Sequence, residues 1–100
     1  MSKGLIFNEK TIFKRNPNVQ DIKTNEGIII SSPNLRDENI YYLDNSISCK
    51  IWSLIDGESP LDKIKQDLLS KYDVNDKTLE KDLKGFIKDL YLKKIILKAK

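Results

Sequence analysis

The chain has no histidine and a single cysteine, Cys49. Without histidine, neither His-based acid–base catalysis nor a His-ligated metal site can be built. Cys49 lies between Ser48 and Lys50 with no partner base of the usual kind, so we interpret it as a small packing residue. One cysteine cannot close an internal disulfide, which favours a reducing, cytoplasmic setting.

Glycine and long apolar runs are scarce as well. The four glycines are scattered and form no phosphate-binding loop, and the acidic residues match no metal-loop spacing. No apolar run approaches the ~18 residues of a membrane span. A chain of 100 residues fits one small domain. We therefore predict a non-catalytic protein with no cofactor, no metal and no membrane partner.

Arginine is also scarce, since Arg15 and Arg36 are the only arginines among 18 basic residues. The 15 acidic residues leave a net charge of +3. Lysines and acids are interleaved in the second half, as on a solvated helix face. Sites that read nucleic-acid sequence usually depend on arginine, whose fork matches guanine and phosphate. The charge pattern therefore does not indicate a nucleic-acid partner.

The first half of the chain holds three short runs of β-branched and aromatic residues separated by turn residues. Asn16-Pro17-Asn18 is a turn signal before the first run, and Asn25-Glu26-Gly27 is a tight connection to the second. The pattern predicts antiparallel strands over residues 19–23, 27–31 and 40–43.

From residue 45 onward the apolar residues follow a helical period. Ser59 before Pro60 predicts the start of a second helix with Ser59 as its cap, and Asp76 is the expected cap of a third helix. The apolar tail at residues 95–97 should close the core. The fold class predicted is α+β, with three helices packed on a small antiparallel sheet. The apolar stripe of the third helix consists of Leu79, Leu83, Phe86, Ile87 and Leu90.

Several short motifs follow one another between about residue 16 and residue 97. They are Asn16-Pro17, Gly27-Ile28-Ile29-Ile30, Tyr42 before Asp44-Asn45, Ile51-Trp52-Ser53-Leu54-Ile55-Asp56-Gly57, Ser59-Pro60-Leu61-Asp62, Tyr72-Asp73-Val74, and Asp82-Leu83 with Phe86-Ile87 and Leu90. In the order and spacing of these motifs the chain resembles the PqqD-like family of RiPP recognition elements, which capture the leader peptides of ribosomally made, post-translationally modified peptides.

The resemblance implies a winged-helix-like domain, a three-stranded antiparallel sheet followed by three helices, at residues 16–98. Residues 1–15 are then an N-terminal extension. Two positions depart from the family's usual pattern. Asp44 stands where the family usually has leucine, and Lys94 stands where a glycine commonly begins the final return.

In this family the leader peptide adds as a strand to the third strand and lies beside the third helix, which is β-augmentation. The corresponding strand edge here is Asn39, Ile40, Tyr41, Tyr42 and Leu43. Because side chains alternate along a strand, Ile40 and Tyr42 face one way and Tyr41 and Leu43 the other. The resemblance places Tyr42 inward. Proline at Tyr41 should then remove a backbone donor from the edge.

On the third helix we predict Ile87 and Tyr91 as apolar peptide contacts, and Lys84 and Lys88 as partners for acids in the leader. The alternative for these residues is that Ile87 belongs to the core and the lysines to a solvated face. The implied partners are the precursor peptide and a separate modifying enzyme or protease. A homodimer through the free strand edge is a further option.

Two other functions remain open from the residues alone. A winged helix could bind DNA through its third helix, although that helix lacks arginine, asparagine and glutamine. A general protein–protein adaptor would use an exposed strand edge equally well. DNA binding would fall steeply with salt, whereas apolar peptide binding would not.

Overall fold

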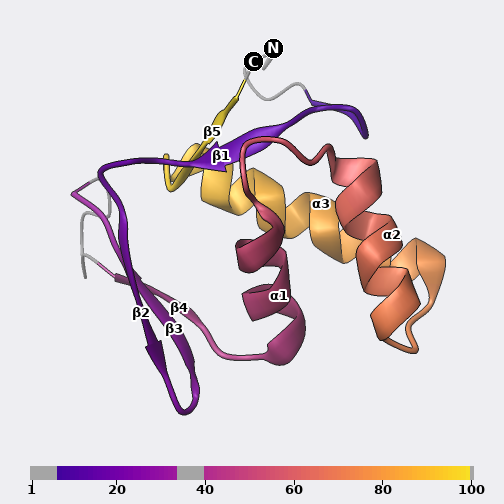
Figure 1. The fold of residues 1–100 in the computed structure, drawn as a ribbon, viewed down its shortest axis with the longest axis horizontal. Coiled ribbons are helices and arrows are strands. Elements are labelled where there is room, and N and C mark those ends of the chain that lie inside the picture. Colours follow the sequence, from indigo (N-terminus) through magenta and orange to yellow (C-terminus); the bar gives the residue numbers. More distant parts are fainter. Residues whose placement is uncertain (1–6, 34–39, 100) are drawn as a thin grey trace.

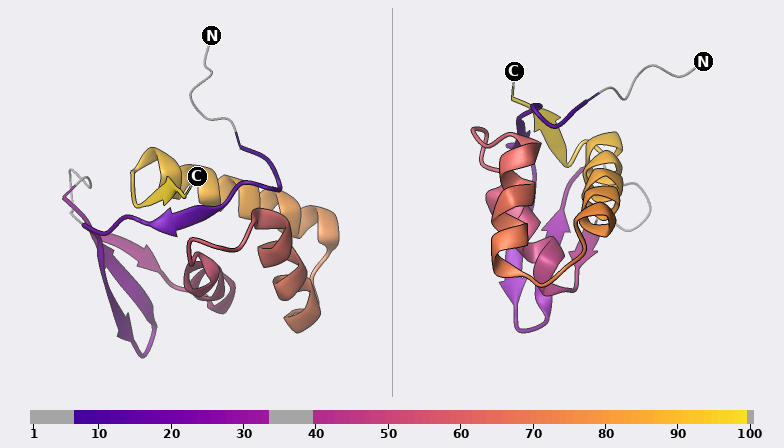
Figure 2. Two further views of the ribbon diagram at one scale, coloured as in Figure 1. Left: turned by 45° about the horizontal axis from the view of Figure 1, so that its top comes forward. Right: turned by 90° about the vertical axis from the view of Figure 1, so that its right-hand side faces the viewer.

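The computed structural model describes residues 7–33 and 40–99 and shows an α+β, winged-helix-like fold. A three-stranded sheet stands at one end of the molecule, and the helices pack beside it (Figure 1). A second, two-stranded sheet lies along the helices, well separated from the first (Figure 2). The elements are β1 (Phe13–Arg15), β2 (Gln20–Thr24), β3 (Gly27–Ser31), β4 (Ile40–Leu43), α1 (Ser46–Leu54), α2 (Leu61–Lys71), α3 (Asp76–Leu92) and β5 (Ile96–Lys98).

The three-stranded sheet confirms the three predicted strands. Its order is β2-β3-β4, and both pairs are antiparallel. The tight connection between β2 and β3 is held by Thr24, whose hydroxyl accepts from the backbone N–H groups of Glu26 and Gly27. Gly27 has no room for a side chain, because a Cβ there would lie 1.9 Å from the carbonyl oxygen of Leu43. This glycine therefore allows β4 to approach β3 closely.

The two-stranded sheet was not predicted. β1 pairs antiparallel with β5, so that Lys14 lies opposite Leu97. Asn16 joins the two strands, since its side chain donates to the Lys94 carbonyl at 2.8 Å and its backbone N–H to the Ile95 carbonyl at 3.0 Å. Phe13 on β1 is buried. Residues 13–15, assigned to an N-terminal extension by the sequence analysis, thus form a strand against the end of the chain.

Two predicted helix caps are wrong. The side chain of Asn75, not that of Asp76, caps α3 by accepting from the Thr78 N–H. No side chain caps α2, because its N-cap position is Pro60, and the hydroxyl of Ser59 donates to Asp56. The three helices and the apolar stripe of α3 agree with the prediction.

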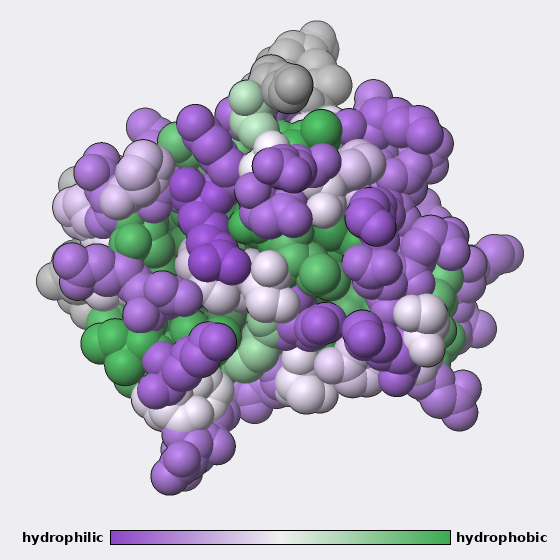
Figure 3. All heavy atoms as spheres, in the orientation of Figure 1, coloured by the Kyte–Doolittle hydropathy of each residue, from purple (hydrophilic) through white to green (hydrophobic). Residues whose placement is uncertain are grey.

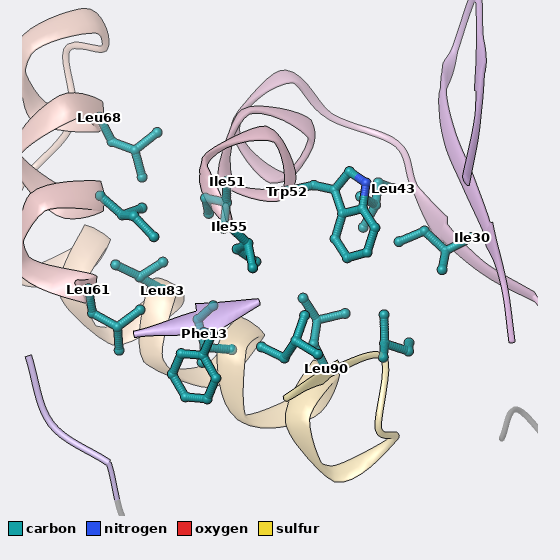
Figure 4. Packing of buried hydrophobic residues seen from close by; sticks show 14 of the residues in the cluster. Phe13, Ile30, Leu43, Ile51, Trp52, Ile55, Leu61, Leu68, Leu83 and Leu90 are labelled. Carbon is teal, nitrogen blue, oxygen red and sulfur yellow. The ribbon is translucent and has the colours of Figure 1, made fainter. Parts of the chain in front are cut away.

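The core lies between the helices and the inner faces of both sheets. Trp52 of α1 points toward Ile30 and Leu43 of the three-stranded sheet (Figure 4). Its indole N–H donates to the Asp21 carboxylate on β2 at 2.8 Å, and the Arg15 guanidinium lies 5.0 Å from its ring. The predicted closure by the tail is confirmed, since Ile95 and Ile96 are fully buried.

The chain turns after α3 at Lys94, one of the two positions that depart from the pattern of the resembling family. It follows α3 with φ of 60°, a left-handed conformation that glycine adopts without strain. The N–H groups of Lys94 and Ile95 donate to carbonyls of the last turn of α3. The return that the family commonly makes with glycine is therefore made here with a lysine.

Candidate peptide-binding edge

The three-stranded sheet has two outer strands, β2 and β4, and their sequences differ in charge. β2 carries Asp21 and Lys23 on the side chains that face the core side of the sheet, opposite Ile30 and Ile28. Charges that point inward from an edge strand discourage the addition of another strand. β4 reads Ile-Tyr-Tyr-Leu and has no charge on either face. Strand addition is therefore favoured at β4.

The backbone groups that β4 offers follow from the close contact at Gly27. The Leu43 carbonyl oxygen points toward β3, since a Cβ built on Gly27 of β3 would lie 1.9 Å from it. In an antiparallel strand the N–H and C=O of one residue point to the same side, and successive residues alternate. Tyr41 therefore also faces β3 with its backbone. Ile40 and Tyr42 direct their N–H and C=O groups toward the open edge.

The side chains of β4 alternate as predicted, but the predicted direction is wrong. Leu43 is buried and Tyr41 is half-buried against the core, whereas Ile40 and Tyr42 are 47% and 44% exposed. The pairing of Leu43 with buried Ile28 fixes this direction. Tyr42 consequently lies on the outer face of the sheet, and Tyr41 is the tyrosine that faces α3.

Tyr41 connects β4 to α3 through a short chain of polar contacts. Its hydroxyl donates to Asp89 Oδ2 at 2.5 Å, and Lys93 Nζ donates to Asp89 Oδ1 at 2.6 Å. Burial raises the pKa of Tyr41, and the hydrogen bond to Asp89 raises it further. Partial burial acts to raise the pKa of Asp89, but the bonds from Lys93 and Tyr41 outweigh it and lower that pKa. The pair is thus a neutral phenol and a carboxylate.

A groove of about 450 Å³ opens beyond the C-terminal end of β4, between the start of α1 and the side of α3. Asn45, two residues after β4, caps α1 and lies at one wall. The floor is apolar, and Thr78 and Asp82 lie among the lining residues. Apolar lining side chains are Ile47, Ile51, Val74, Leu79, Leu83 and Phe86. The groove can accept an apolar side chain.

The α3 residues predicted as peptide contacts do not lie on this flank. Ile87 is fully buried and presents no surface to a peptide. Tyr91 packs edge-on against Phe13 of β1, with ring centroids 5.7 Å apart. Lys84 pairs with Glu80 and lines a different groove beside α2. Lys88 is exposed, and helical spacing places it about 100° around α3 from Asp89.

Asn39 lies outside the described residues. The α3 residues that contact Tyr41 of β4, Asp89 and Lys93, were not predicted, and neither was Phe86 as a lining residue of the groove. Their spacing of three and four is visible in the sequence. What the sequence could not show is that this flank, and not the one with Tyr91, meets β4.

Other chemistry is not evident in residues 7–33 and 40–99. They contain no group of three or more histidine, cysteine or acidic residues placed to hold a metal ion. None of the helices in this part of the chain is long and apolar enough to cross a membrane. The β4 edge and its adjoining groove form the candidate site in the described residues.

Comparison with known families decides the relationship. The family model described as "Coenzyme PQQ synthesis protein D (PqqD)" matches residues 26–96. The chain belongs to the PqqD family. The match spans β3, β4 and all three helices, and so includes both sides of the candidate edge. It confirms the family that the sequence motifs indicated.

Two solved structures are similar to this PqqD-family chain. One, "TbiB1 in Complex with the TbiA(beta) Leader Peptide", has a TM-score of 0.70 and 23% identity, covering 83% of this chain and 93% of that one. The other, "Lasso peptide synthetase B1 complexed with the leader peptide", has a TM-score of 0.66 and 25% identity, covering 85% and 96%. No curated protein gives a significant match.

Proposed function

We propose that this chain is a leader-peptide-binding module that adds the leader of a ribosomally made precursor peptide as a strand to β4. The observation that carries the proposal is the uncharged, open edge of β4 beside the groove on α3. Membership of the PqqD family supports it. Both similar structures are described as complexes with leader peptides, which supports it as well.

The energetics require side-chain binding in addition to strand pairing. Ile40 and Tyr42 offer four backbone groups to the edge. At about 1 kcal/mol net per hydrogen bond these contribute roughly 4 kcal/mol. Ordering each peptide residue costs about 1–2 kcal/mol, so pairing alone does not hold a disordered leader. Micromolar affinity needs about −8 kcal/mol, and the apolar groove is the place where the remainder can arise.

The proposal assigns no catalytic step to this chain. Modification of the bound peptide then falls to a separate enzyme or protease, in the cytoplasm where precursor peptides are made. The DNA-binding alternative gains nothing from the structure, because Arg15 is already engaged with Trp52. In the proposed complex, α3 lies beside the bound leader peptide and does not enter a DNA groove.

Fluorescence polarisation tests the proposal directly. Labelled N-terminal halves of the short peptides encoded beside the gene are titrated at low and high salt, with their C-terminal halves as matched controls. We expect one N-terminal half to bind saturably, with an affinity that changes little with salt. A duplex DNA probe serves as the negative arm. Binding of DNA that falls steeply with salt, with no peptide bound, would contradict the proposal.

A further inference from the structure

The outer face of the three-stranded sheet carries a row of exposed apolar side chains. Ile22 of β2 lies opposite Ile29 of β3, and Ile29 lies opposite Tyr42 of β4, so the three form one line across the sheet. Ile22 is 61% exposed, and Ile40 beside Tyr42 is also exposed. Apolar side chains reach the surface on this side of the molecule, at the left of Figure 3. We refer to this surface as the outer sheet face.

The outer sheet face is also free of charge. Its residues are Gln20, Ile22, Thr24, Gly27, Ile29, Ser31, Ile40 and Tyr42. In a chain of which 33% is charged, the charged residues of these strands, Asp21 and Lys23, both point to the opposite face. Depletion of charge together with exposed aromatic and aliphatic residues distinguishes the core of a protein–protein interface from ordinary surface.

The size of the face indicates what kind of partner covers it. Its exposed apolar side chains offer on the order of 300 Å². A standard interface buries about 800 Å² from each partner, of which roughly 450 Å² is non-polar, so this face alone offers less apolar surface than such an interface uses and two copies stacked through it would associate weakly. A peptide strand added at β4 continues the sheet and places alternate side chains on this same face. A bound peptide therefore enlarges this face by the side chains of its alternate residues.

We propose that the outer sheet face is the docking surface for the enzyme that modifies the bound peptide, and that this enzyme contacts the sheet and the peptide strand together. The proposal rests on the proposed function. The surface of the enzyme that fits is uncharged and apolar. Because the peptide completes the surface, peptide and enzyme bind with positive coupling, and each raises the affinity for the other by the same factor.

Ile22→Lys tests this without touching the peptide edge. Ile22 lies two strands away from the open edge of β4, at about 10 Å from the β4 backbone. We expect Ile22→Lys to leave the affinity for the N-terminal peptide within about twofold and to weaken binding of the enzyme encoded beside the gene at least about tenfold. The rate of peptide modification, followed by mass spectrometry, should fall in proportion. Ile29→Thr provides a second variant that keeps strand preference.

The matched control is Ser70→Lys, which adds the same charge on exposed α2. It should leave enzyme binding unchanged. Full enzyme binding by Ile22→Lys would overturn the inference while the proposed function stands, because peptide affinity is measured separately. So would a wild-type dimer that dissociates in Ile22→Lys during sedimentation, since a second copy would then cover this face. Enzyme affinity that is the same with and without peptide would also overturn it.

Discussion

At the scale of single residues, the hydrogen bond from Tyr41 to Asp89 holds β4 against α3. Tyr41 and Asp89 lie 48 positions apart in the sequence, and their side chains join β4 to α3. Lys93, four residues after Asp89, shares the carboxylate and lies 5.7 Å from the Tyr41 ring. β4 is therefore joined to α3 by a protonated phenol that donates to one member of an ion pair.

Alkaline pH should act on this contact. The folded-state pKa of Tyr41 is raised above its unfolded value of about 10, chiefly by burial and then by Asp89. The stability from this residue is thus present in full below about pH 10 and is lost as the pH rises above it. We expect the free energy of unfolding in urea to fall more steeply between about pH 10 and pH 12 in wild type than in Tyr41→Phe.

The comparison with Tyr41→Phe cancels the titration of the many lysines. Tyr42→Phe is the matched control, because the Tyr42 hydroxyl makes no hydrogen bond to a described residue. It should keep the steep alkaline loss of the wild type. Equal slopes for wild type and Tyr41→Phe would show that the phenol does not contribute.

At the scale of elements, the sequence predicts the strands and helices well and their faces less well. Alternation along β4 correctly groups Tyr41 with Leu43, but it is symmetric, so pairing with buried Ile28 had to decide which pair faces inward. The helical period likewise gives the apolar stripe of α3. It does not show which flank of that stripe meets β4, because the other flank packs on β1, whose partner β5 lies at the far end of the chain.

Because of the direction of the β4 backbone, the most informative proline substitution is at Tyr42 and not at Tyr41. Tyr42, not Tyr41, presents its N–H to the open edge. We expect Tyr42→Pro to weaken peptide binding at least about tenfold while largely retaining the fold, since proline is tolerated at a free strand edge. Polarisation titrations alongside urea unfolding measure both effects.

Tyr41→Pro is the contrasting variant. It removes a donor that faces β3 together with the phenol bonded to Asp89, so it should lower stability more than Tyr42→Pro does. Unchanged peptide affinity in a folded Tyr42→Pro protein would rule out strand addition at β4.

At the scale of the whole molecule, the two sheets differ in what they do. One has an exposed edge and face, and the other pairs two segments that are far apart in the sequence. The three-stranded sheet offers an open edge and an uncharged face. The two-stranded sheet brings the ends of the described chain together across the helices (Figure 1). The sequence analysis set the domain boundary at residue 16, because a run of three strand residues carries little signal before its distant partner is known.

Phe13 tests where the domain begins. It is 1% exposed and packs edge-on against Phe7 and Tyr91. Replacing a buried phenylalanine by alanine costs about 3–5 kcal/mol, a large share of the ~5–15 kcal/mol of a small domain. We expect Phe13→Ala to lower the free energy of unfolding measured in urea by that amount, and Lys14→Ala, at the exposed neighbouring position on β1, to leave it unchanged.

A shortened chain that starts at Asn16 should lose more stability than Phe13→Ala does. It lacks Phe13 and also leaves β5 without its only strand partner in the described chain. Ile96 of β5 would then lose part of its cover, and the buried return through Ile95 would lose the strand that closes over it. We expect this shortened chain to unfold without a sharp cooperative transition and to bind no peptide. A shortened chain with the wild-type midpoint and peptide affinity would show instead that the binding domain begins at residue 16 and that β1 is dispensable.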